Sequence, residues 1–363
     1  KPVGTSGVAV PSRLERFDAS VGVTSDENEL KVAINHVSLR APESDFQVND
    51  LSGVIRRTMN AVTLENVSLR TAETSLRVAG TVHNVEGGVP SLDVKASSDK
   101  LTMSEIARLV PMLAQYRMQP AFEISAKGPL DRMDVDLNVR EANLGNVIGD
   151  LVVDANGSDK RVAGAVSMNH FNVAPLIPDS PTGPTTLKSD ITGQAQIDLG
   201  LPTATQRLNG TYAVQASRVN FVGYEARDLN ARGRIDDRLV KVNASAAAYG
   251  GYATANGTVN ITPLALNLTG RANNIDLRNL PPVFANVKGV PSDLQFTCTL
   301  NGRDGVYSGN ATLDASTVAG ATIAPGMTAE FKVGGGAPEY GANGQVSNLD
   351  VRSEEHTSEL QSR

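Results

Sequence analysis

The residues that could perform chemistry are few and far apart in this chain. The histidines before its C-terminal end are His36, His83 and His170, and none stands in a His-Glu-x-x-His or His-x-His pattern, the spacings that bring two imidazoles onto one metal ion. We therefore expect no metal site and no catalytic histidine. We also expect the chain to need no cofactor and not to be an enzyme.

Two pairs of carboxylates, Asp134/Asp136 and Asp236/Asp237, have types suited to acid–base catalysis or to calcium binding. Asp134 and Asp136 alternate with apolar residues, which places them on the solvated face of a strand. Neither pair has the Asp-x-Asp-x-Asp-Gly spacing of a calcium loop. We interpret both pairs as surface charges.

The single cysteine, Cys298, excludes an intramolecular disulfide and a cysteine-rich zinc site. It alternates with Leu294, Phe296 and Leu300, so the pattern predicts a packed apolar side chain rather than a nucleophile. The glycines at 334–336 lack the Lys-Ser/Thr of a phosphate-binding loop.

Alternation of apolar and polar residues, with a period of two, recurs along the chain, for example at 76–82, 133–139 and 264–268. This period predicts β-strands with one apolar and one solvated face. Asn-Gly or Asp-Gly pairs predict tight turns between strands. They stand at 156–157, 209–210, 301–302, 304–305 and 343–344.

Residues 104–117 differ, because Ile106, Leu109, Val110 and Leu113 recur at helical spacing after Ser104, a candidate N-cap. We expect a helix there that Pro111 kinks or divides into two short turns. Shorter helical or loop crossovers are expected at 173–177 and 277–284.

A block of sequence occurs twice, at residues 50–82 and 228–259, and each copy opens on Asp-Leu and closes on Gly-Thr-Val. A weaker copy spans 144–166. A second motif follows the strand after each block, at 100–103, 170–173, 274–277 and 348–351. Such self-similarity is typical of proteins built by stacking units. We therefore expect function to lie in a long shared surface rather than in a pocket.

The strand spacing predicts about 25 strands, and a single open sheet of that size would be ~120 Å long at ~4.8 Å per strand. Open sheets of more than ~10 strands normally curl or split. We predict an all-β, elongated, repetitive antiparallel sheet curled into a U-shaped groove, with one or a few short crossover helices. A closed sandwich core is the alternative.

The candidate site is the apolar face of this sheet, a lining of small residues without Trp that would leave room for a slender ligand. We trace this groove through Val32, Ile34, Leu76, Val78, Val135, Leu137, Leu264, Leu266, Leu268, Leu294, Phe296 and Leu300.

Composition limits the class of protein. With 40% hydrophobic and 20% charged residues the chain is globular rather than disordered. A net charge of -6, a pI near 5.4 and the lack of a Lys/Arg run argue against nucleic-acid binding. No apolar run approaches the ~20 residues of a membrane-spanning helix.

Residues 352–363 need separate treatment. The sequence of 352–362, Arg-Ser-Glu-Glu-His-Thr-Ser-Glu-Leu-Gln-Ser, resembles the translation of a common sequencing adapter, and we exclude it from fold and function as an artefact. His356 is therefore not a site residue. We expect residues 1–351 to be a fragment of a repetitive β-sheet region, with the natural protein extending beyond both ends.

The chain resembles the AsmA-like superfamily of bacterial envelope proteins, which includes TamB. The resemblance rests on the strand, Tyr-Gly-Gly, strand, Gly-Thr-Val unit at 239–259, on Asn-Ile-Asp-Leu-Arg-Asn-Leu at 274–280 and Phe-Asn-Val-Ala-Pro-Leu at 171–176, and on Val-Ser-Leu-Arg at 37–40 and 67–70. It covers nearly all of residues 15–351.

The resemblance implies a long, U-shaped β-sheet anchored in the bacterial inner membrane, in the periplasm, with an apolar groove. It implies phospholipid acyl chains as the cargo, and contact with the inner and outer membranes through regions absent from this fragment. The expected function is conduction of phospholipid between the two membranes, in support of outer-membrane biogenesis.

Two alternatives from other classes remain. The first is a scaffold of the TamB type, which offers a strand edge for the assembly or secretion of outer-membrane proteins. The second is a surface β-solenoid adhesin with a closed interior, which the irregular spacing of the repeats disfavours.

Overall fold

The structure, a computed structural model, describes residues 13–348 except 117, 177–187, 204–205, 222, 262, 282–288, 304, 335 and 338. The described residues form 23 strands, one short α-helix and four 3-10 segments. The all-β class predicted from the sequence is confirmed, and the strands pair antiparallel throughout. The C-terminal segment at 352–363 lies outside the described residues.

The chain divides into two compact units. Unit 1 comprises Lys1–Tyr224 and Arg234–Asp237, and unit 2 comprises Glu225–Gly233 and Arg238–Arg363. Strand β13 (Tyr224–Asp236) therefore supplies residues to both units. Each unit is described below by itself.

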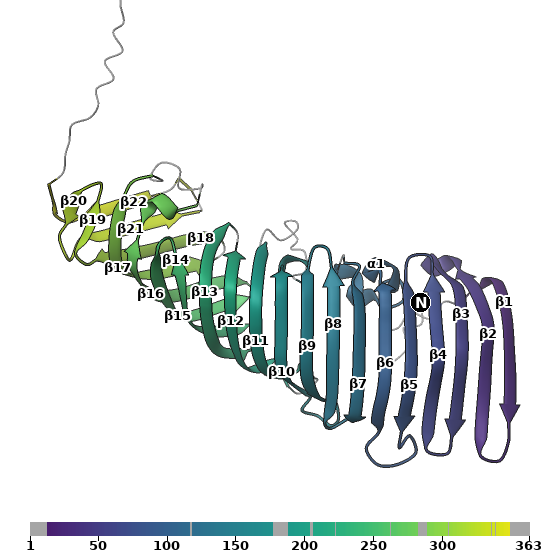
Figure 1. The fold of residues 1–363 in the computed structure, drawn as a ribbon. Helices are drawn as coiled ribbons and strands as arrows, with labels where there is room; N and C mark the ends of the chain where they lie inside the picture. The colour runs from purple at the N-terminus through teal and green to yellow at the C-terminus, as the bar shows by residue number, and fades with distance from the viewer. Residues whose placement is uncertain are drawn as a thin grey trace, which may run out of the picture. The chain divides into compact units, whose positions relative to one another are not determined.

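Unit 1 is a meander in which each strand from β1 to β12 pairs with the next (Figure 1). Alternating apolar and polar residues of high strand propensity build these strands. They are β1 (Glu15–Ser25), β2 (Glu29–Ala41), β3 (Phe46–Thr58), β4 (Ala61–Thr71), β5 (Ser75–His83), β6 (Ser91–Lys100), β7 (Ala121–Pro129), β8 (Met133–Glu141), β9 (Gly145–Asp154), β10 (Arg161–Phe171), β11 (Ser189–Gly200) and β12 (Asn209–Phe221).

The helical segments of unit 1 all follow even-numbered strands. They are η1 (Pro42–Ser44), α1 (Met103–Ile106), η2 (Pro111–Gln115) and η3 (Ala174–Leu176). Because successive strands run in opposite directions, these connections share one edge of the sheet, the crossover edge, with the β4–β5 and β8–β9 turns. The turns that follow odd-numbered strands lie at the other edge, the hairpin edge. Figure 1 shows α1 at the crossover edge.

The helix expected at 104–117 is shorter than predicted. Its α-helical part is α1, with Thr102 rather than Ser104 at the N-cap, and a 3-10 turn begins at Pro111. Pro111 therefore divides the segment, as expected from its missing N–H.

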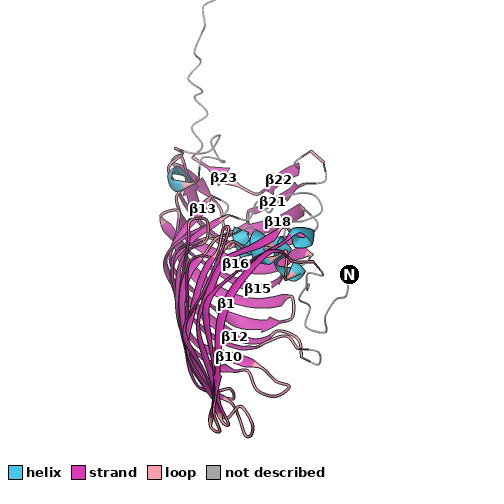
Figure 2. Cartoon of the chain, turned by 90° about the vertical axis from the view of Figure 1, so that its right-hand side faces the viewer, coloured by secondary structure: helices cyan, strands magenta, loops and turns pink. Residues whose placement is uncertain are grey.

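The sheet of unit 1 is curled into a U-shaped groove, and its strands bend along their length (Figure 2). The crossover segment packs on the apolar face, where Leu109 contacts a small buried cluster of Ala41, Phe46 and Val48. This face is therefore the inner one.

In unit 2, β14 to β18 pair in chain order, and β21 and β22 extend that sheet from β18. A branch of β19, β20 and β23 pairs with the first residues of β17. The elements are β14 (Leu239–Ala248), β15 (Gly251–Ile261), β16 (Leu264–Ile275), η4 (Leu277–Asn279), β17 (Ser292–Arg303), β18 (Val306–Leu313), β19 (Ser316–Val318), β20 (Ala321–Ile323), β21 (Thr328–Val333), β22 (Glu339–Asn343) and β23 (Val346–Ser347).

Two of the turns predicted from Gly pairs are wrong, because Asn209–Gly210 opens β12 and Asn301–Gly302 lies inside β17. Asn343–Gly344 does connect two strands, β22 and β23, but β23 pairs with β20 rather than with β22. Residue 304 of the turn predicted at 304–305 lies outside the described residues. The turn at Asn156–Gly157 is confirmed, since it joins β9 to β10.

Candidate functional site

A continuous row of apolar residues and glycines crosses all twelve strands of unit 1. Each member is the direct cross-strand partner of the next, so all share the inner face. The row is Val23, Val32, Ile55, Leu64, Gly80, Val94, Ala126, Val135, Leu151, Gly164, Ile197 and Tyr212.

A second row runs beside the first, one side chain further toward the crossover edge. From β4 onward it reads Val67, Val78, Ala96, Ile124, Leu137, Gly149, Val166, Ala195 and Val214. On β1 to β3 it is Val21, Ile34 and Gly53, and a register shift separates the two parts. The sequence predicted which residues share the apolar face but not which residues pair across strands. The structure shows that these residues pair in two ordered rows.

The six groove residues predicted in unit 1 all belong to this inner face. Val32 and Val135 lie in the first row, and Ile34, Val78 and Leu137 lie in the second. Leu76 lies beside them, opposite Leu69.

Unit 2 has an inner face of the same kind. Leu266 pairs with Val259 and Gly302, Leu268 pairs with Leu300, and Phe296 pairs with Ala272. The other predicted residues of this unit are Leu264, opposite Ile261, and Leu294, opposite Ile275. Cys298 shares the face and pairs with Ala311.

The crossover segment contacts the apolar face of unit 1 at Ala41, Phe46 and Val48, and no second sheet of described strands packs against that face. None of the twelve predicted groove residues is buried: eleven are half-buried and Leu264 is 36% exposed. In a closed sandwich such residues would be almost fully buried, because two inner faces interdigitate. The closed core considered from the sequence is therefore wrong for the described chain, and the apolar surface is open.

The repeated Gly-Thr-Val has a structural cause. A Cβ at Gly80 would lie 2.1 Å from the carbonyl oxygen of Asp93, and one at Gly257 would lie 2.0 Å from that of Asn267. In the weaker copy, a Cβ at Gly164 would lie 2.2 Å from the carbonyl oxygen of Asp150. Each block therefore ends on a residue where the neighbouring strand approaches too closely for any side chain.

The second repeated motif builds a clamp at the crossover edge. Ser189 accepts a hydrogen bond from the Val173 N–H and donates one to the Phe171 carbonyl. In unit 2, Ser292 makes the same two bonds to the Leu277 N–H and the Ile275 carbonyl. The polar third residue of the motif then starts the 3-10 turn.

Asn172 and Asp276 are these third residues. Asn172 Oδ1 accepts from the N–H groups of Ala174 and Ser189, and Asp276 Oδ1 accepts from the N–H of Arg278. The guanidinium of Arg278 also binds Asp276 and holds the pKa of that carboxyl below its ordinary value. The motif is thus structural, and it closes the sheet edge between units of the repeat.

The most buried carboxylate of the described chain is Glu105 of α1, 1% exposed. Its Oε2 accepts from the Thr71 hydroxyl at 2.5 Å and its Oε1 accepts from the Glu73 N–H at 3.3 Å. Thr102 adds a bond from its hydroxyl to the Glu73 carbonyl. No cation pairs with Glu105 among the described residues, so its role is to anchor the crossover segment to the β4–β5 turn.

Two histidines expected to be isolated have carboxylate partners. His36 Nδ1 lies 2.7 Å from Asp50 Oδ1, and His170 Nδ1 lies 3.0 Å from Asp190 Oδ1. Ser52 donates to Asp50 and not to His36, so the group lacks the hydroxyl–imidazole contact of an activated nucleophile. The described residues contain no group of three or more potential metal ligands.

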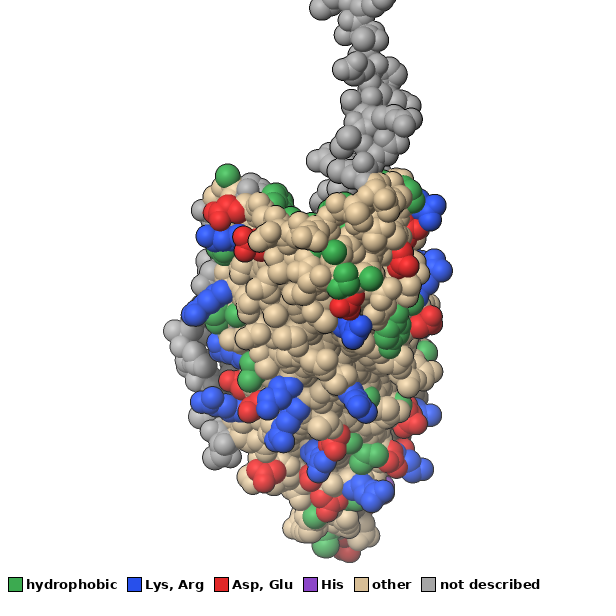
Figure 3. Space-filling model, turned by 90° about the vertical axis from the view of Figure 1, so that its left-hand side faces the viewer, with side chains coloured by type: hydrophobic (Ala, Val, Ile, Leu, Met, Phe, Trp, Pro, Cys, Tyr) green, Lys and Arg blue, Asp and Glu red, His purple; other side chains and the backbone are tan. Residues whose placement is uncertain are grey.

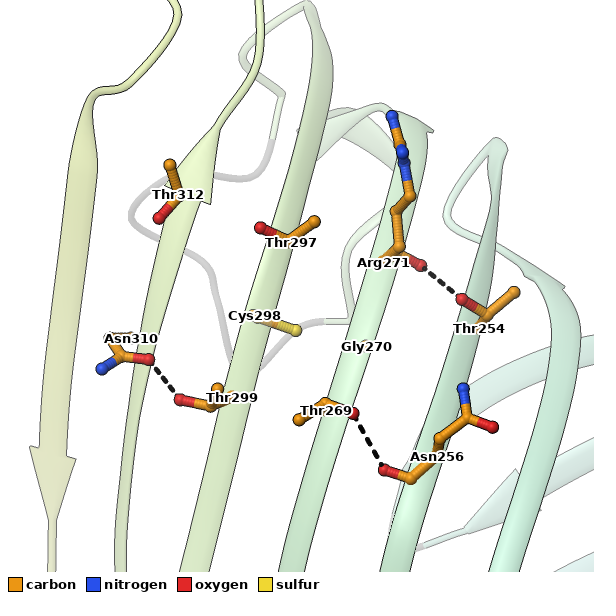
Figure 4. A pocket seen from close by; sticks show the side chains of 10 residues that line it. All are labelled: Thr254, Asn256, Thr269, Gly270, Arg271, Thr297, Cys298, Thr299, Asn310 and Thr312. Atoms are coloured by element: carbon orange, nitrogen blue, oxygen red, sulfur yellow. Dashed lines mark hydrogen bonds between the residues drawn. The ribbon is translucent and has the colours of Figure 1, made fainter.

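The outer face of unit 2 is polar and carries a shallow pocket of about 410 Å³. Figure 4 shows its Thr and Asn side chains in rows on neighbouring strands, where the Thr254 hydroxyl donates to the Arg271 carbonyl and that of Thr269 to the Asn256 carbonyl. The pocket lining contains no carboxylate or histidine for acid–base work. Figure 3 shows one side of the molecule, where Lys, Arg, Asp and Glu side chains are scattered among other side chains and backbone.

Cys298 contributes to the pocket lining, but its side chain belongs to the inner face. Burial raises the pKa of its thiol. Because the thiolate is the reactive form, this environment suppresses nucleophilic chemistry.

Comparisons with protein-family models, with curated proteins and with solved structures returned no match. Within the part of the chain that the structure describes, no helix has the length and apolarity required to cross a bilayer.

Proposed function

We propose that the apolar inner face conducts phospholipid, with acyl chains lying along its rows. The observation that carries this proposal is the unbroken row of apolar residues and glycines across twelve paired strands. The described chain leaves this row half-buried, except at exposed Val23 and buried Leu151. Soluble proteins rarely expose a contiguous apolar patch of this extent unless it meets a ligand, a membrane or another protein.

The energetics suit a conduit. Moving an acyl chain of a dozen methylenes from water onto an apolar surface is favourable by roughly 10 kcal/mol, at ~0.8 kcal/mol per CH₂. Relative to the bilayer that the chain leaves, the change is close to zero. A surface of this kind can therefore accept a lipid without retaining it.

The resemblance to the AsmA-like superfamily supports a setting for this activity. In that setting the chain is a non-enzymatic segment of a periplasmic protein that is anchored in the inner membrane and passes lipid toward the outer membrane.

Native mass spectrometry of residues 1–351, produced in the periplasm, tests the proposal. We expect co-purified phospholipid, and we expect Leu266→Glu or Phe296→Glu to remove it because a carboxylate on the inner face repels acyl chains. Asn267→Glu is the matched control, since Asn267 is exposed on the opposite face of the same strand. Equal lipid content in Leu266→Glu and Asn267→Glu would rule the proposal out.

A second function, scaffolding of outer-membrane polypeptides, is favoured by the edge of unit 1. Strand β1 pairs only with β2 among the described residues, and it exposes Phe17 by 62%, Val21 by 48% and Val23 by 65%. An open edge with apolar side chains can pair with an incoming strand. Under this function, a proline on the outward N–H positions of β1 would impair client assembly more than Leu266→Glu does.

A further inference from the structure

A positively charged cleft lies at the hairpin edge of unit 1, where the β9–β10 turn meets the β11–β12 connection. Its volume is about 610 Å³, and Lys160, Arg161 and Arg234 line it together with Asp159 and Asp198. The cleft therefore has three cations against two carboxylates in a chain whose net charge is -6.

Two of the three cations are available to a ligand. Arg161 is held by Asp198 through a two-pronged ion pair, Nε to Oδ1 at 2.6 Å and Nη2 to Oδ2, which satisfies both charges. That pairing raises the pKa of Arg161 and lowers the pKa of Asp198. Lys160 and Arg234 make no side-chain hydrogen bond or ion pair with any described residue.

The cleft adjoins the last apolar row of the inner face. That row is Val153, Val162, Leu199 and Gly210. Arg161 is the chain neighbour of Val162, and neighbouring residues of a strand are only ~3.3 Å apart while their side chains point to opposite faces. Arg161 and Asp198 face outward, and at this rim the Leu201 N–H donates a hydrogen bond to the Lys160 carbonyl. A ligand that reaches both faces must therefore pass over the turns that end the strands.

We propose that this cleft binds the phosphate of an anionic phospholipid whose acyl chains lie on the inner face of β10 to β12. The proposal rests on the proposed function and adds selectivity for the headgroup. Lys160 and Arg234 supply the charge, and a guanidinium and an ammonium are the groups that recognise phosphate in proteins. The Arg161–Asp198 pair, already satisfied, would hold the wall of the cleft in place.

The test measures binding of the chain to phosphatidylcholine vesicles with and without phosphatidylglycerol. We expect the unaltered chain to prefer the anionic vesicles. In Lys160→Gln/Arg234→Gln the preference for anionic vesicles should fall about tenfold, because two exposed charge contacts are removed. Binding of this variant to phosphatidylcholine vesicles should not change. The preference should also fall with salt.

Lys95→Gln/Lys127→Gln is the charge-matched control, since both lysines are exposed on the outer faces of β6 and β7. Its preference should equal that of the unaltered chain. If both double variants lose the preference for anionic vesicles, the preference is a general charge effect and the assignment of the cleft is overturned. If Lys160→Gln/Arg234→Gln keeps the preference, the cleft does not bind the phosphate and the assignment is overturned as well.

Two further outcomes separate this proposal from the function on which it rests. If the unaltered chain binds neither kind of vesicle, the conduit itself fails. If glycerol phosphate binds to the unaltered chain but not to Lys160→Gln/Arg234→Gln, while no vesicle binds, the cleft takes a soluble phosphate and the lipid assignment is overturned.

Discussion

Thr71 donates a 2.5 Å hydrogen bond to Glu105, joining the end of β4 to the crossover helix 34 positions later in the sequence. The bond fixes the helix against the open apolar face, although the acceptor is a carboxylate that is 1% exposed and has no cation beside it in the described chain. A buried carboxylate is tolerated only when its hydrogen bonds are made. The stability of this corner should therefore depend on Glu105 itself.

Replacing Glu105 by Ala should lower the free energy of unfolding by about 2 to 4 kcal/mol, because it leaves the Thr71 hydroxyl and the Glu73 N–H without an acceptor. Glu105→Gln keeps one carbonyl acceptor and should cost less. Urea denaturation followed by circular dichroism measures both. Glu123→Ala is the control on an exposed strand position, and equal losses in Glu123→Ala and Glu105→Ala would refute the anchoring role.

The glycines that close the repeats should not accept a methyl group. Gly80→Ala and Gly257→Ala force a Cβ to within 2.1 and 2.0 Å of a neighbouring carbonyl oxygen, so each should cost more than about 1 kcal/mol and disturb the local pairing. Gly87→Ala is the matched control, since a Cβ at Gly87 would meet no atom within 4 Å. Thermal unfolding gives the comparison, and a Gly80→Ala midpoint equal to that of Gly87→Ala would contradict it.

The sequence predicted the inner face well because alternation is local. A period of two assigns each residue to a face before any partner strand is known, and so Val32, Val135 and Leu268 were placed correctly. The repeated Gly-Thr-Val pointed to a recurrent constraint, but its cause, the approach of the next strand, depends on register. Register is a property of two strands and is only weakly visible in one.

What sequence reasoning missed is non-local. His36 and Asp50 stand on different strands, and Lys160 and Arg234 come together only because β10 to β13 pair as they do. The Asn301–Gly302 signal failed because β17 pairs with β16 and β18 through that point, and ladder hydrogen bonds outweighed turn propensity. The polar third residue of the repeated motif, Asn172 or Asp276, is the sequence signal that could have indicated the clamps.

Acid should weaken unit 1 partly through Asp50. The hydrogen bond from His36, aided by the Ser52 hydroxyl, lowers the pKa of Asp50 from its ordinary 3.8. The folded state therefore releases this proton more readily than the unfolded state. The stability that Asp50 contributes is complete above pH 3.8 and is lost as the pH falls through the lowered value.

Asp50→Asn should remove that part of the pH dependence. The urea midpoint of unfolding, measured at several pH values between about 2 and 6, should fall less steeply toward low pH in the variant than in the unaltered chain. If the midpoints of both proteins fall equally steeply toward low pH, the His36–Asp50 pair does not contribute to stability.

Cys298 should react slowly with thiol reagents. Burial raises the pKa of its thiol, which reduces the thiolate fraction at neutral pH, and the side chain shares the inner face. Thr297→Cys in a Cys298→Ser background places the thiol on the exposed outer face of the same strand and should react faster. A slower or equal rate for that variant would contradict the assignment of faces in β17.

The most direct measurement of the central claim is site-specific photocrosslinking to phospholipid in cells. A photoreactive residue at Leu137 or Leu266 faces the apolar rows, whereas one at Asp136 or Asn267 occupies the neighbouring position on the outer face. The conduit predicts lipid adducts at Leu137 and Leu266 and none at Asp136 and Asn267. Adducts at all four positions, or at none, would contradict it.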